Sequence, residues 1–117
     1  MDVIDIKAFV PSRDYERSLA FYSEIGFESE YVTDDLTVFQ NGECLLFLQR
    51  FYQEELARNF MLQICVSDID EAFALCSRSK HKTKISEIQS ETWGKVFYLW
   101  GPSDELLHVT QLRQHQG

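Results

Sequence analysis

The sequence lacks the features that mark several large classes of protein. It carries 11 Lys and Arg residues against 19 Asp and Glu residues, a net charge of −8. That balance disfavours nucleic acid as a partner, because phosphates require a basic surface. No apolar run approaches the length that crosses a bilayer, and the acidic start does not resemble a signal peptide. We therefore expect a cytoplasmic protein whose partners include neither a membrane nor nucleic acid.

Cysteine is also scarce. The 3 cysteines are an odd number, and no C-x-x-C pair occurs. Cys44, Cys65 and Cys76 each fall inside a segment predicted to be a strand or a helix, which favours buried free thiols over disulfides or a nucleophile. Free thiols agree with a reducing compartment. The sequence contains no glycine-rich phosphate loop, and no Ser/His/Asp set has a supporting context.

What the chain does contain is an internal repeat. An alternating segment precedes an acidic helix start twice, and Asp14 of the first copy aligns with Asp68 of the second without a gap. The same offset pairs Tyr15 with Ile69, Leu19 with Phe73 and Tyr22 with Cys76, positions that share one helix face. With 44% hydrophobic and 14% aromatic residues in 117, the composition is that of one globular domain whose halves share a core.

Each half is predicted to contain a strand, a helix and three further strands. In the first half we expect strands at residues 4–10, 28–32, 36–40 and 43–49, and a helix at 13–24 that ends at a left-handed Gly26. A polar bridge at 50–59 follows. In the second half we expect strands at 60–66, 84–88, 95–100 and 106–110, and a helix at 67–77 with a Ser67/Asp70 capping box. Residues around His115 are predicted to be a frayed tail.

Several short motifs then occur in a fixed order. They are VPSRD at residues 10–14, FY at 21–22, IGF at 25–27, VSDID at 66–70, WG at 93–94, GPSD at 101–104 and LLHVTQ at 106–111. In this order they resemble the vicinal oxygen chelate (glyoxalase/bleomycin-resistance/dioxygenase) superfamily, and within it the bleomycin-resistance proteins. The resemblance implies an α+β fold in which two βαβββ modules, at about residues 1–52 and 58–117, form a curved, half-open mixed sheet within one domain.

The resemblance also locates the four metal-ligand positions of the superfamily's enzymes. They fall at Lys7, at Phe47 or Gln49, at Met61 and at His108. A divalent ion requires three or four His and carboxylate ligands, and this set offers one. We therefore expect no metal, no other cofactor and no catalytic residues, which favours a protein that is not an enzyme.

Strand parity predicts where a ligand would bind. At residues 60–66 the even-numbered side chains are apolar and should pack on a helix, so the odd-numbered ones face the concave side. The same rule on the other strands selects the rest of a ligand-binding face: Phe47, Gln49, Met61, Gln63, Tyr98, Trp100 and His108. The resemblance to bleomycin-resistance proteins, through the WG motif, implies that Trp93 lies at the rim of this face.

Alternatives remain open for several of these residues. The aromatic side chains could fill the core instead, and His108 could be a hydrogen-bonding wall residue. Lys7 requires a partner, which could be Asp5, a ligand carboxylate or an interface carboxylate. The basic run at residues 78–84 could be a solvated loop or an anion site.

Three functions compete on this basis. The first is a non-catalytic protein that binds a small, antibiotic-like molecule, aromatic or cationic, and an acidic surface would suit a cation. The second is a lyase, isomerase or dioxygenase of the same superfamily. The third is a dimeric scaffold without a small ligand. A homodimer is expected in any case, because a half-open sheet exposes an aromatic face.

Overall fold

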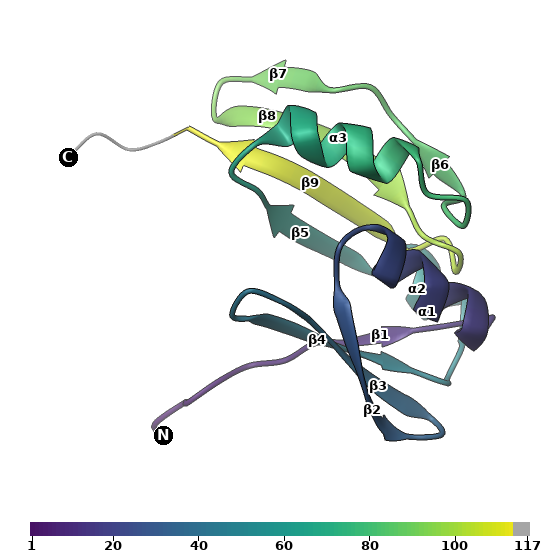
Figure 1. The fold of residues 1–117 in the computed structure, drawn as a ribbon. Coiled ribbons are helices and arrows are strands. Elements are labelled where there is room, and N and C mark those ends of the chain that lie inside the picture. Colours follow the sequence, from purple (N-terminus) through teal and green to yellow (C-terminus); the bar gives the residue numbers. More distant parts are fainter. Residues whose placement is uncertain (114–117) are drawn as a thin grey trace.

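The protein forms two βαβββ-like halves in a computed structural model that describes residues 1–113 (Figure 1), so the tail predicted around His115 lies outside the described residues. The elements of the first half are β1 (Phe9–Pro11), α1 (Tyr15–Glu24), β2 (Glu28–Thr33), β3 (Leu36–Asn41), β4 (Cys44–Gln49) and the bridging α2 (Glu54–Asn59). Those of the second half are β5 (Met61–Cys65), α3 (Ile69–Ser77), β6 (Lys84–Ile85), β7 (Gln89–Glu91), β8 (Gly94–Trp100) and β9 (Leu106–Leu112). No helix of this described part is long and apolar enough to cross a membrane.

The strands form two sheets with matching topology. The first sheet has the order β1-β4-β3-β2, and the second has the order β5-β9-β8-β6 with β7 also paired to β8. In each sheet the first strand runs parallel to the last strand of its half, whereas the other pairs are antiparallel. This confirms the predicted α+β fold class and its half-open form. The sheet is not continuous, however, since the described strands of the two halves do not pair with each other.

The aligned aspartates begin the two long helices. Asp14 is the N-cap of α1 and accepts a hydrogen bond from the Arg17 N–H, and Asp68 is the N-cap of α3 and accepts from the Asp70 and Glu71 N–H groups. Such caps satisfy backbone donors that have no partner within the helix. The predicted Ser67/Asp70 capping box is wrong by one residue, because the carboxylate that reaches the first turn belongs to Asp68.

The strand predicted at residues 4–10 is mostly absent. Only Phe9–Pro11 pair with β4, in register with Phe47 to Gln49, and the Phe47 N–H donates to the Ala8 carbonyl as the chain leaves the sheet. Residues 1–8, the N-terminal arm, extend away from the fold (Figure 1). Ile4 and Ile6, which the alternation of the predicted strand would place on its helix-packed side, are 99% and 84% exposed because no apolar residue among 1–113 covers them.

Two further expectations need correction. The strand predicted at residues 84–88 is divided into β6 and a separate β7 at Gln89–Glu91. All three cysteines are free, as predicted, but only Cys76 is buried, and this burial raises its pKa to about 11. Cys44 and Cys65 are exposed because each is the terminal residue of its strand, where the cover of neighbouring elements ends.

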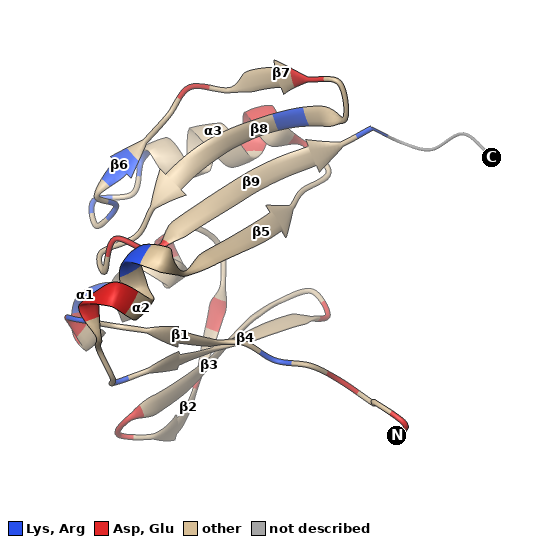
Figure 2. Ribbon diagram, turned by 180° about the vertical axis from the view of Figure 1, so that it is seen from behind, with Lys and Arg blue, Asp and Glu red and all other residues tan. Residues whose placement is uncertain are grey.

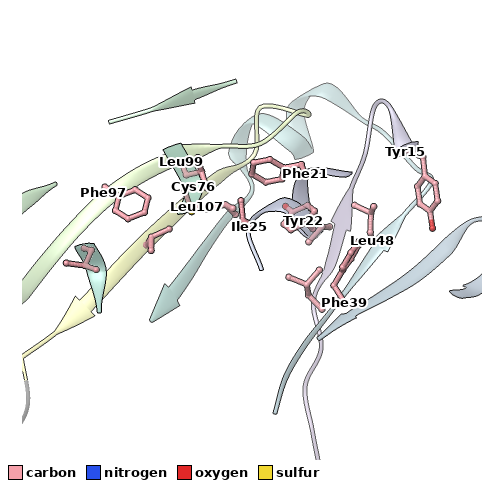
Figure 3. Packing of buried hydrophobic residues seen from close by; sticks show 14 residues of the cluster. Tyr15, Phe21, Tyr22, Ile25, Phe39, Leu48, Cys76, Phe97, Leu99 and Leu107 are labelled. Atoms are coloured by element: carbon pink, nitrogen blue, oxygen red, sulfur yellow. The ribbon is translucent and has the colours of Figure 1, made fainter. Parts of the chain in front are cut away.

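Helix α1 lies between the two sheets and supplies the shared core (Figure 3). The Tyr22 ring contacts Phe39 of the first sheet at 5.6 Å between centroids and Phe21 edge-on at 5.0 Å. Phe21 belongs to the same buried cluster as Leu99 and Leu107 of the second sheet. On the second sheet α3 covers one face, where Phe73 packs edge-on against Phe97 at 5.3 Å.

A buried carboxylate fastens the last turn of the chain to α1. The Tyr22 hydroxyl donates to Glu105 Oε2 at 2.9 Å, and the Ser103 N–H donates to Oε1 at 2.9 Å. Glu105 is fully buried, and this burial raises its pKa. Gly101 is required beside it, because a Cβ there would lie 2.5 Å from the carboxylate carbon.

A second polar connection joins α1 to the basic loop after α3. Glu24 accepts hydrogen bonds from the Ser79 hydroxyl at 2.7 Å, from the Lys80 N–H, and pairs with His81 Nδ1 at 2.9 Å. Burial raises the pKa of Glu24, but the Ser79 and His81 hydrogen bonds outweigh it and hold the pKa below its usual value. Lys82 donates to the Ser77 and Ser79 carbonyls at the end of α3. Much of this loop is therefore structural.

Glu105→Gln is expected to change the pH dependence of stability. Because the folded-state pKa of Glu105 is raised, the stability contributed by the neutral acid is complete below the unfolded-state pKa and is lost as pH rises through the folded-state pKa. A glutamine stays neutral, so the free energy of unfolding of E105Q relative to wild type should increase from about pH 5 to about pH 8. Urea denaturation at both pH values measures this. Glu28→Gln, at an exposed position, controls for the lost charge, and parallel pH profiles for E105Q and wild type would contradict the assignment.

Candidate functional site

Figure 2 views the second sheet from the face that is turned away from α3, and the strand register places a row of polar and aromatic residues on this face. We call it the uncovered face. Cross-strand register places Gln63 opposite His108, and His108 opposite Tyr98. The adjacent row contains Met61, Leu106 and Trp100. The alternate residues of the same strands, among them Phe97, Leu99 and Leu107, are buried on the α3 side. Tyr98 and His108 therefore point away from the helix-packed core, as strand parity predicts.

The rings on this face contact one another. Tyr98 and His108 meet edge-to-face with centroids 5.0 Å apart, and Tyr98 lies 6.3 Å from Trp100 at a tilt of 49°. Edge-to-face and tilted pairs at such distances attract each other, so the rings support one another's orientation. Tyr98, Trp100 and His108 are half-buried. A flat molecule could therefore contact ring surface that is exposed but already ordered.

The structure separates the other predicted site residues from this group. Phe47 lies on the first sheet and stacks on Phe9 at 4.8 Å, and Gln49 is opposite Leu36 on the same sheet. Trp93 is in the turn between β7 and β8 and is 44% exposed. Its strand neighbour Gly94 is at the opposite end of β8 from Trp100. Five of the eight predicted residues thus share one face, and three lie elsewhere.

One residue of the uncovered face was not anticipated. Lys84 is opposite Trp100 in the β6–β8 pairing, and its Nζ lies 5.0 Å from the centroid of the Trp100 ring. That distance is within the range of a cation–π interaction. The only sequence signal was the position of Lys84 at the start of a predicted strand, and strand pairing cannot be read from that position alone.

Lys7 has a partner within the chain. Its Nζ lies 2.5 Å from Asp5 Oδ2, and this hydrogen bond, followed by one from the Ile6 N–H, lowers the pKa of Asp5. Of the partners left open by the sequence, the carboxylate of Asp5 is the one found here. The pair is on the exposed N-terminal arm.

The residues at the superfamily's metal-ligand positions do not fit a divalent ion. Lys7 Nζ is committed to Asp5, and Met61 offers a soft thioether that oxygen-preferring ions do not select. At the second position Phe47 has no donor atom, and the alternative Gln49 offers a neutral amide in place of a His or a carboxylate. His108 alone is a usual ligand, and its ring lies against Tyr98. Within residues 1–113, no group of three or more His, Cys, Asp or Glu residues is placed to hold a metal.

A cleft of about 620 Å³ lies on the other side of the second sheet, along α3. Its walls come from α3, the end of β5, the turn after α1 and the start of β4, and both exposed cysteines, Cys44 and Cys65, line it. The lining includes apolar Ile64, Leu75 and Val109. None of the predicted ligand-binding residues reaches this cleft.

Comparison with solved structures places this arrangement among known folds. A bleomycin resistance determinant encoded on the transposon Tn5 superposes with a TM-score of 0.80 at 22% identity, covering 96% of this chain and 100% of that chain. The bleomycin-binding protein of Streptomyces verticillus complexed with copper(II)-bleomycin gives 0.80 at 17% identity, covering 97% and 99%. A lactoylglutathione lyase from Agrobacterium tumefaciens gives 0.71 at 14% identity, covering 94% and 95%.

The chain has the glyoxalase/bleomycin-resistance fold. The likeness covers nearly the whole of each chain, which is consistent with the superfamily that the ordered motifs predicted. No protein-family model and no curated protein matches the sequence. Since each identity is below 25%, the likeness establishes the glyoxalase/bleomycin-resistance fold and not the ligand.

Removal of metal ions is expected to leave the melting temperature unchanged, because a set with one usual ligand gains no binding energy from a cation. The measurement is thermal unfolding before and after extensive dialysis against a chelator. A higher melting temperature on adding zinc, nickel or manganese, lost in His108→Ala, would show that the register assigned to these positions is wrong.

Proposed function

We propose that the protein is a non-catalytic cytoplasmic protein that binds a small, flat, antibiotic-like molecule on the uncovered face of the second sheet. One observation carries the proposal: Tyr98 contacts both Trp100 and His108, and yet all three rings remain half-exposed. Binding sites combine aromatic surface with a few polar groups that orient the ligand. Gln63 and His108 supply those polar groups.

The residues at the predicted metal-ligand positions favour a binding protein over an enzyme. The superfamily's enzymes use a metal, and the corresponding positions here hold Lys7, Phe47 or Gln49, Met61 and His108. Free thiols at all three cysteines support a reducing compartment. The neighbours that bind bleomycin share the fold at 17–22% identity, which supports a binding role without naming the ligand.

The proposal includes a homodimer. Four apolar residues of the N-terminal arm are more than 60% exposed: Met1, Val3, Ile4 and Ile6. Phe9 and Met61, at the borders of the two sheets, are also half-exposed or more. Exposed apolar surface of this kind marks interaction sites. A second copy would cover the arm and would bring another sheet face toward the site, which is how Phe47, Gln49 and the rim residue Trp93 would join it.

Ligand binding is tested by replacing one ring of the face. Bleomycin, the ligand of two structural neighbours, is titrated against wild type, Tyr98→Ala and Tyr31→Ala, with tryptophan fluorescence and calorimetry as readouts. Loss of the Tyr98 contact should weaken binding by roughly 0.5–1.5 kcal/mol. Tyr31 is an exposed tyrosine on β2, so its variant should bind as wild type does. If neither bleomycin nor other planar aromatic molecules bind, or if both variants bind equally, the proposed site is wrong.

The homodimer is tested by light scattering at micromolar concentration. Wild type should show the mass of two chains, and Ile4→Ser with Ile6→Ser should shift the protein toward the monomer because the arm then buries less apolar surface. Val32→Ser, which removes an exposed aliphatic residue from β2, is the matched control. A wild-type protein that is monomeric under these conditions would contradict the dimer.

A further inference from the structure

We infer that the ligand of the uncovered face carries a negatively charged group, and that Lys84 binds this group at the β6 edge. The inference rests on the proposed function, because it names the ligand class of the same site. It concerns a planar aromatic anion, such as an aryl carboxylate or sulfonate. The net charge of −8 favoured a cation instead, so the local charges decide between the two.

The ammonium group of Lys84 has no carboxylate partner. Among the described residues 1–113, no Asp or Glu oxygen lies within 4.0 Å of its Nζ. Its closest identified partner is the face of Trp100, at 5.0 Å. Lys7, Arg13, Arg50 and Arg58 each have a carboxylate partner, whereas Lys84 faces an aromatic ring instead. It is a cation positioned to accept an external anion.

The backbone holds Lys84 in place on both sides. The Thr83 N–H donates to the Trp100 carbonyl at 2.8 Å, and the Ser86 N–H donates to the Tyr98 carbonyl at 2.8 Å. The Ser86 hydroxyl oxygen also accepts from the Tyr98 N–H at 2.8 Å. These bonds fix β6 against β8, and antiparallel pairing then directs Lys84 and Trp100 to the same face. The position of the cation is therefore set by the sheet.

Lys82, a nearby cation of the basic loop, is used differently, because its ammonium donates to the Ser77 and Ser79 carbonyls at the end of α3. Lys84 is the member of this loop that reaches the uncovered face. Figure 2 shows that β5 and β9 carry no charged residue and that the basic colour of β6 lies at the edge of the sheet.

Glu91, an acidic residue that the cross-strand register places on the same face, is distant from Lys84. Glu91 is opposite Gly94 in the β7–β8 pairing, whereas Lys84 is opposite Trp100. The six-residue separation along β8 corresponds to about 20 Å at ~3.4 Å per residue. At physiological ionic strength, charges beyond a Debye length of about 8 Å are largely screened. An anionic group near Trp100 would therefore experience Lys84 and little of Glu91.

Lys84 also disfavours a cationic ligand. The ring face of Trp100 is the surface on which a ligand cation would stack, and the ammonium of Lys84 already lies over it. A cationic ligand would have to displace Lys84 or bind beside a like charge. An anionic aromatic molecule instead places its ring on Tyr98 and His108 and its charge on Lys84.

The experiment uses three probes with one ring system: naphthalene-2-sulfonate, the neutral 2-naphthalenemethanol and 2-naphthylmethylammonium. Each is titrated at about 150 mM salt while the indole N–H resonance of Trp100 is followed by NMR, with Trp93→Phe used to assign it. Lys84→Gln removes the charge. Lys95→Gln removes the same charge from β8, the strand of Trp100, at an exposed residue of opposite parity to Trp100, and is the matched control.

Wild type should bind the sulfonate more tightly than the neutral probe and the ammonium probe least tightly. Lys84→Gln should weaken sulfonate binding about three- to five-fold, the upper part of the range for an exposed ion pair, and strengthen ammonium binding. Lys95→Gln should change neither by as much as two-fold. If the three probes bind equally well, or the two variants behave alike, the inference is wrong and the proposed binding function stands. If no probe shifts the Trp100 resonance, the proposed site itself fails, and the inference with it.

Discussion

The structure depends on the burial of α1 between two sheets that would each be too small to stand alone. Each sheet has one long helix and a modest apolar face, and a chain of 117 residues has little surface to spare for two separate cores. Phe21 and Tyr22 are fully buried and belong to a single cluster that includes residues of both sheets. Aromatic residues bury about 150–250 Å² each, so these two side chains account for much of the contact between the halves.

Burial of α1 between the two sheets also buries the polar hydroxyl of Tyr22. The turn before β9 supplies the hydrogen-bond acceptor that this hydroxyl requires. The Tyr22 hydroxyl lies inside the core, where an unpaired hydroxyl would destabilise the fold by about 1–3 kcal/mol. Glu105 accepts its hydrogen bond, but the carboxylate is buried in turn and requires the Ser103 N–H and the space left by Gly101. The GPSD turn and the helix residue it satisfies are far apart in sequence, and they form one structural unit.

Features that follow from the internal repeat and from local periodicity could be predicted from the sequence. Features that depend on pairing between distant strands could not. The alignment of Asp14 with Asp68 anticipated where both helices begin to within two residues, though not the capping residue itself, and strand parity anticipated the uncovered face, because both follow from local periodicity. Local periodicity did not predict the structure of the N-terminal arm. Ile4 and Ile6 alternate with polar residues as in a strand, but a strand also requires a neighbouring strand, and β4 pairs only with Phe9–Pro11. The prediction that Cys44 and Cys65 are buried was wrong for a similar reason, since the exposure of a residue at a strand end depends on which distant elements pack against it. Lys84 could not be placed beside Trp100 without the register of β6 on β8.

Net charge proves a poor guide to the chemistry of the face for a related reason. The excess of acidic residues is distributed over the surface, and its field decays within about 8 Å at physiological salt. A bound molecule on the uncovered face would contact β5, β8 and β9, and β5 and β9 contain no Asp, Glu, Lys or Arg. The charged group that lies against the Trp100 ring is Lys84, a single residue at the sheet edge. Composition gives the average charge that the protein presents to solvent, whereas strand register determines which charged side chain lies beside a bound ligand.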